Sequence, residues 1–129
     1  MEDPYDPTEA ELRAWAYGQE SMEPVQDFDL MVATESRAEL LYEFASDSKC
    51  PTKDYFLHCL YLLVGDAVRS KYRTSKKEAI ERVVKHGQES VSNSIQRWSE
   101  RSKNLMEHPE SFSYDSWCGG GLAYERTSG

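Results

Sequence analysis

The chain has 129 residues, of which 39% are hydrophobic and 29% are charged, and its formal net charge at pH 7 is −8. This length is sufficient for one domain with a hydrophobic core, and an aromatic content of 12% excludes a disordered polypeptide. The longest apolar run is much shorter than the roughly 20 residues that a membrane-spanning helix needs, so we exclude a transmembrane protein.

The charge is distributed unevenly along the chain. Residues 1–54 carry 14 acidic and 4 basic side chains, a net charge of −10, whereas residues 55–107 carry 6 acidic and 10 basic ones, a net charge of +4. The N-terminus lacks the basic and apolar regions of a signal peptide, and the three cysteines have no framework spacing. We therefore expect a cytoplasmic protein with free thiols.

The acidic half contains three expected helices. Asp6 is a suitable N-cap before Pro7, and this pair predicts a short helix that ends near Gly18. Glu23-Pro24 predicts the start of a second helix, because proline is favoured in the first helical turn. A third helix is expected over residues 37–46, followed by a short link that favours an antiparallel pairing with the next helix.

The stretch from Cys50 to Arg73 is the centre of the expected fold. Pro51 suits the first turn of a helix, and apolar side chains then recur on two adjoining stripes with Leu60 in the middle. Only a narrow polar strip remains, so other elements must cover this helix on two or three sides. Gly65 lies within it, and we expect a close helix crossing there, or alternatively a notch where a ligand approaches the backbone.

Residues 75–107 show the most regular helical periodicity of the sequence. One unbroken helix of this length would measure about 45 Å at about 1.5 Å per residue, which is longer than a compact domain of this size. We expect a break at His86-Gly87. Because no segment alternates as a strand does, the sequence predicts a single all-α domain over residues 1–129, with five or six helices between residues 6 and 107.

The segment 108–129 is irregular and aromatic. His108-Pro109 ends the helical region, because proline cannot continue a helix. The aromatic and apolar side chains that follow predict that the segment packs back on the helices. These side chains are Phe112, Tyr114, Trp117, Leu122 and Tyr124.

Cys118 is the candidate for a catalytic nucleophile, because three glycines follow it. Glycine amides after a thiol can bind an anion, and His86 or His108 would have to supply a base. No nucleophile signature matches these residues, so a small enzyme or thiol-dependent factor is an alternative function and not the leading one. The cysteines and histidines lack the paired spacing of metal ligands, and we expect neither a metal nor another cofactor.

Residues 69–85 carry seven basic and two acidic side chains, which indicates a second alternative, contact with nucleic-acid phosphates. The overall isoelectric point near 4.9 means that the molecule as a whole repels a polyanion, so nucleic acid is not the partner we expect. The candidate residues for this contact are Arg69, Lys71, Arg73, Lys76 and Lys77.

The acidic half provides the leading functional hypothesis. A dense acidic surface on a small helical protein suits the capture of a basic protein, by functional analogy with antitoxins and toxin-immunity proteins. The other interpretation is that these charges only keep the protein soluble. We expect a non-enzymatic interaction module, whether or not it also forms homo-oligomers. Its candidate partner-binding residues are Asp6, Glu9, Glu11, Glu20, Glu23, Asp27 and Asp29.

Overall fold

The computed structural model describes residues 1–18, 23–113 and 117. These residues form six α-helices and two short 3-10 helices, and none of them lies in a β-strand, so the expected all-α fold is confirmed. Within the same ranges, no helix is both long and apolar enough to cross a bilayer. The helices are α1 (Glu9–Tyr17), α2 (Phe28–Val32), η1 (Glu35–Arg37), α3 (Ala38–Ser46), α4 (Lys53–Arg69), α5 (Lys77–Gln88), α6 (Asn93–Glu107) and η2 (Pro109–Ser111).

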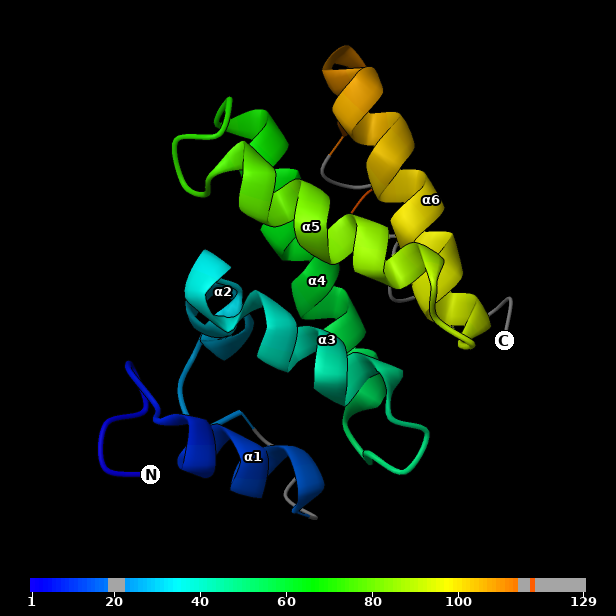
Figure 1. Ribbon diagram of the computed structural model, residues 1–129. Helices are drawn as coiled ribbons and strands as arrows, with labels where there is room; N and C mark the ends of the chain where they lie inside the picture. The colour runs from blue at the N-terminus through cyan, green and yellow to red at the C-terminus, as the bar shows by residue number, and fades with distance from the viewer. Residues whose placement is uncertain (19–22, 114–116, 118–129) are drawn as a thin grey trace.

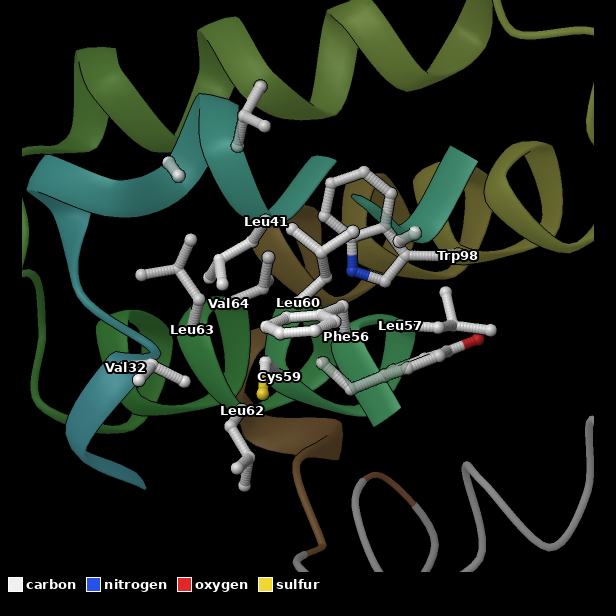
Figure 2. Close-up of a cluster of buried hydrophobic side chains, with 14 of the residues drawn as sticks. Val32, Leu41, Phe56, Leu57, Cys59, Leu60, Leu62, Leu63, Val64 and Trp98 are labelled. Atoms are coloured by element: carbon white, nitrogen blue, oxygen red, sulfur yellow. The ribbon is translucent and has the colours of Figure 1, made fainter. Parts of the chain in front are cut away.

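Helix α4 lies at the centre of the fold and packs against α2, α3, α5 and α6 (Figure 1). Eleven of its 17 residues are buried, which leaves only a narrow strip of its surface to water. Figure 2 shows Leu60 and Leu57 of α4 in one cluster with Leu41 of α3 and Trp98 of α6. The predicted central helix is therefore confirmed, and its apolar circumference explains why helices cover it on several sides.

Helix α1 begins later than the sequence indicated. Its N-cap is Thr8, whose hydroxyl accepts a hydrogen bond from the Glu11 N–H at 3.1 Å, while the Glu11 carboxylate accepts one from the Thr8 N–H at 2.9 Å. This capping box satisfies two N–H groups that the first helical turn leaves open. Asp6 instead forms an ion pair with Arg37 at 3.0 Å. The prediction of Asp6 as the N-cap is wrong, because Thr8 offers the reciprocal pair.

The long periodic region is two helices, and the break comes at residues 89–92, just after the expected His86-Gly87. Gly87 lies inside α5 and is buried against α6. A Cβ atom at Gly87 would lie 2.9 Å from Cζ3 of Trp98, so the missing side chain permits the close crossing of these two helices. The Ser99 hydroxyl donates a hydrogen bond to the Val84 carbonyl at 2.6 Å across this crossing. This close packing of α5 against α6 keeps α5 helical at Gly87.

Gly65 of α4 contacts the C-terminal segment and not another helix. A Cβ atom at Gly65 would lie 2.7 Å from Cδ1 of Trp117 and 3.2 Å from Cε2 of Phe112. The Trp117 indole N–H donates a hydrogen bond to the Tyr61 carbonyl at 2.6 Å. The expected helix crossing at Gly65 is wrong, because Phe112 and Trp117 of the C-terminal segment pack against the core there. The remaining apolar residues of the segment, Tyr114, Leu122 and Tyr124, lie outside the described residues.

The burial of α4 generates a prediction about stability. Leu60 is 0% exposed, so Leu60→Ala should lower the free energy of unfolding by about 2–5 kcal/mol, as loss of a buried leucine side chain does. Leu30, which is 46% exposed, provides the matched control, and Leu30→Ala should cost less than about 0.5 kcal/mol. Urea unfolding followed by circular dichroism measures both. Equal losses would mean that the interior of α4 is assigned wrongly.

Gly65→Ala tests the contact with Trp117. The added methyl group would meet the indole, and overpacking of this kind costs about 1–3 kcal/mol, more than the roughly 1 kcal/mol that alanine gains in helix propensity. In a Trp117→Ala background the obstacle is gone, so the same change should be much less costly there. Urea unfolding of the four variants forms a double-mutant cycle. The same loss in both backgrounds would contradict the packing of Trp117 on Gly65.

Candidate functional site

Exposed carboxylates lie where side chains of α1 reach those of α3 and of its C-cap. Arg13 of α1 forms ion pairs with Glu9 of the same helix and with Glu43 of α3. The Tyr17 hydroxyl at the end of α1 donates a hydrogen bond at 2.6 Å to Asp47, which caps α3. The contacts of Arg13 with Glu43 and of Tyr17 with Asp47 each join residues that are 30 positions apart in the sequence. We refer to Asp6, Glu9, Glu43 and Asp47 as the acidic surface.

Two arginines are held within the acidic surface by contacts inside the chain. Arg13 lies between two glutamates, and their hydrogen bonds raise its pKa. Arg37 is 3.0 Å from Asp6 and also donates a hydrogen bond to the carbonyl of residue 7 at 3.2 Å. The hydrogen bond from Tyr17 lowers the pKa of Asp47 and raises that of Tyr17 to about 12. Arg13 therefore joins α1 to α3, Arg37 joins η1 to the turn before α1, and the acidic surface keeps an excess of negative charge.

Glu23 and Asp29 face α4. The Tyr55 hydroxyl donates a hydrogen bond to Glu23 at 2.8 Å, and His58 Nε2 lies 3.0 Å from Asp29 Oδ2. The hydrogen bond with His58 lowers the pKa of Asp29, whose side chain is only 23% exposed. Asp27 is exposed and precedes α2 with a φ of 60°. Glu23 and Asp29 thus hold α2 and the turn before it against α4.

The predicted partner-binding residues therefore have different roles in the structure. Glu11 caps α1 and also accepts a hydrogen bond from the Glu2 N–H at 2.8 Å. Glu20 lies outside the described residues. Asp6 and Glu9 belong to the acidic surface, together with Glu43 and Asp47, which sequence reasoning did not select. Nothing local in the sequence marks the last two, because only the pairing of α1 with α3 brings them there.

A hollow of about 560 Å³ lies beside α1. Trp15 lines it and is 8% exposed. The Trp15 ring makes edge contacts with Phe28, Tyr55 and Phe56 at centroid distances of 5.3, 5.1 and 5.8 Å. Among the residues that the structure describes, none accepts a hydrogen bond from the indole N–H of Trp15. The lining of the hollow includes Pro4, Glu11, Ala14, Trp15, Gly18 and Pro24.

The basic candidates for nucleic-acid contact surround the turn between α4 and α5, at the other end of the molecule from α1 (Figure 1). Arg69 forms an ion pair with Asp66 at 3.1 Å, and the Lys77 Nζ atom lies 5.8 Å from the centroid of the Tyr72 ring. Tyr72 is therefore half-buried beneath a lysine of its own chain. The five candidates, Arg69, Lys71, Arg73, Lys76 and Lys77, are all exposed.

Cys118 lies outside the described residues, as do the three glycines after it. The described cysteines, Cys50 and Cys59, are both buried, and burial raises the pKa of Cys59, which disfavours the reactive thiolate. His86 stacks on Tyr42 at a centroid distance of 4.3 Å. In residues 1–18, 23–113 and 117, no three side chains of metal-ligand type converge on one point.

No protein-family model, no curated protein and no solved structure matches this chain. The acidic surface combines carboxylates that tertiary contacts bring together from segments far apart in the sequence.

The Asp29–His58 contact should make stability depend on pH. Because the folded pKa of Asp29 lies below its unfolded value, the contact contributes stability above the unfolded pKa, and this contribution is lost as the pH falls through the folded pKa. Between about pH 5 and pH 2, wild type should lose more stability than Asp29→Asn. Urea unfolding at a series of pH values measures this difference, with Asp27→Asn as a control in the same turn. Parallel curves for wild type and Asp29→Asn would contradict it.

Proposed function

We propose that the protein is a non-enzymatic interaction module that binds a basic protein partner through its acidic surface. The observation that carries this proposal is that the fold links carboxylates from separate segments: Glu9 and Glu43 share Arg13, Asp6 pairs with Arg37, and Asp47 accepts a hydrogen bond from Tyr17. Residues 1–54 have a net charge of −10, so this end of the molecule produces a strong negative potential.

The ion pairs of the acidic surface also prepare it for binding. Arg13 and Arg37 fix the carboxylates that they contact, so less side-chain freedom remains to be lost when a partner docks. Glu9 and Asp6 nevertheless have side chains that are 71% and 82% exposed, and their remaining oxygen lone pairs can accept hydrogen bonds from lysine or arginine. Exposed charges of this kind act chiefly by accelerating association.

The partner and the protein are proposed to meet in the cytoplasm. Cys50 and Cys59 are free and buried, which is typical of proteins in a reducing compartment. The exposed basic residues around the α4–α5 turn provide a competing binding surface, which lysine variants can test.

Neutralising the acidic surface should slow association. Affinity capture on the immobilised protein at low salt supplies the partner, which should be basic. For Glu9→Gln with Glu43→Gln, we expect an association rate about 3–10-fold lower than wild type, and a weaker dependence of that rate on salt. Glutamine retains hydrogen-bonding groups next to Arg13 and a good helix propensity, so the fold should persist. Surface plasmon resonance over a range of salt concentrations measures the rates.

Two matched variants complete this experiment. Glu78→Gln with Glu81→Gln removes the same charge from exposed positions of α5 and should bind as wild type does. Lys76→Gln with Lys77→Gln removes two charges from the basic candidates and should also leave association intact. If the lysine pair fails while the acidic pair binds normally, the proposed function is wrong and the basic residues carry the interaction.

A further inference from the structure

We propose that the groove between α5 and α6 binds a second copy of this chain, so that the protein forms a two-fold symmetric dimer through this face. The dimer is independent of the proposed function, because it uses a different surface and a different partner. The spacing and the signs of the charged side chains along the groove support it.

The groove consists of two adjoining hollows of about 390 and 560 Å³. Both hollows are lined by Gln88, Lys103 and Glu107, so they form one groove along α5 and α6. Val84 and Met106 contribute its apolar part. The charged side chains that line the groove are all exposed to solvent. They are Lys77, Glu81, Lys85, Glu100, Lys103 and Glu107.

The signs of these charges alternate along each helix, and the order on α5 is opposite to the order on α6. On α5 the order is positive, negative, positive, at Lys77, Glu81 and Lys85. On α6 it is negative, positive, negative, at Glu100, Lys103 and Glu107. Intervals of three or four residues keep each set on one face of its helix. Within residues 1–18, 23–113 and 117, none of the six forms an ion pair, so their charges are not neutralised inside the chain.

A contact at the helix crossing shows which residues of α5 and α6 lie at the same level. The Ser99 hydroxyl donates its hydrogen bond to the Val84 carbonyl, so these two residues are level. Helix α5 approaches the turn at residues 89–92 and α6 leaves it. One helical turn away from the crossing, Glu81 is therefore level with Lys103.

A two-fold axis along the groove places α5 of one copy over α6 of the other, with the two helices running in opposite directions. Residues that are level in one chain then face each other across the interface, and each contact occurs twice. Every contact between the charged residues of the groove joins opposite signs, so this face is complementary to itself. The pairs between the two copies are Glu81 with Lys103, Lys77 with Glu107 and Lys85 with Glu100.

The local charge permits this association although the whole molecule carries a net charge of −8. The six charges of the groove sum to zero, and residues 55–107 together carry a net charge of +4, so the acidic excess lies elsewhere in the chain. Exposed ion pairs are individually weak. We therefore expect a concentration-dependent dimer with a dissociation constant on the order of 0.1 mM.

Sedimentation velocity of the full chain in about 0.15 M salt tests the proposal through charge reversal. Glu81→Lys and Lys103→Glu each place like charges opposite each other twice, and each should weaken dimerisation about tenfold. The double variant restores the pairs with reversed signs and keeps the wild-type net charge, so it should dimerise as wild type does. Lysine and glutamate have similar helix propensities, so both helices should persist. Glu78→Lys, at an exposed position of α5 that does not line the groove, should leave the dimer unchanged.

A mixture of the two single variants distinguishes contacts between copies from contacts within one chain. A dimer of Glu81→Lys with Lys103→Glu contains only attractive pairs at these positions, so the mixture should associate more strongly than either variant alone. If the double variant dimerises but the mixture does not associate, the two side chains interact within one chain and the proposed dimer is wrong.

Other results would also overturn the proposal. Wild type that stays monomeric at about 1 mM does not self-associate through this face. Dimerisation that is equal in all the variants must use another face. If the protein is monomeric and the groove variants instead weaken capture of the basic partner, the groove binds that partner and not a second copy. None of these results decides whether the acidic surface binds a partner, which the Glu9 and Glu43 variants test separately.

Discussion

The structure depends on the burial of one helix. Helix α4 has apolar side chains around most of its circumference, and Leu60, Val64 and Ala67 are completely removed from water. Such a helix cannot exist at the edge of a fold, because each uncovered leucine would forfeit about 1.5–3 kcal/mol of hydrophobic stabilisation. The arrangement of α2, α3, α5 and α6 around it follows from this requirement. Their outward faces are then free to carry charge.

The periodicity of the sequence was sufficient to predict this core. Apolar spacing identified α3, α4 and the pair α5 and α6, because burial of one helical face imposes a repeat that local sequence preserves. Helix starts were less predictable, since Thr8 and Asp6 are both acceptable caps and only the reciprocal bond with Glu11 decides between them. At Gly65, the missing side chain indicates that another group approaches closely, but the sequence does not show which one. The group is the indole of Trp117, more than 50 positions later in the chain.

The candidate site was predicted less completely, for a related reason. Sequence reasoning identified the acidic half, yet it ranked carboxylates by their position along the chain. Glu11, Glu23 and Asp29 are occupied in capping and in contacts with α4, whereas Glu43 and Asp47 join Glu9 through tertiary packing. A sequence shows how many acidic residues a segment has. Only the structure shows which of these carboxylates hold the helices together and which remain available on the surface.

The indole of Trp117 has a consequence for where the folding unit ends. Its hydrogen bond to Tyr61 and its contact with Gly65 place residue 117 within the core, although the last α-helix in the described part of the chain stops at Glu107. A boundary drawn from helices alone would remove part of the interior and uncover the glycine face of α4. The smallest expression fragment that preserves this packing therefore includes residue 117. An affinity tag should follow this residue and should not replace the segment that contains it.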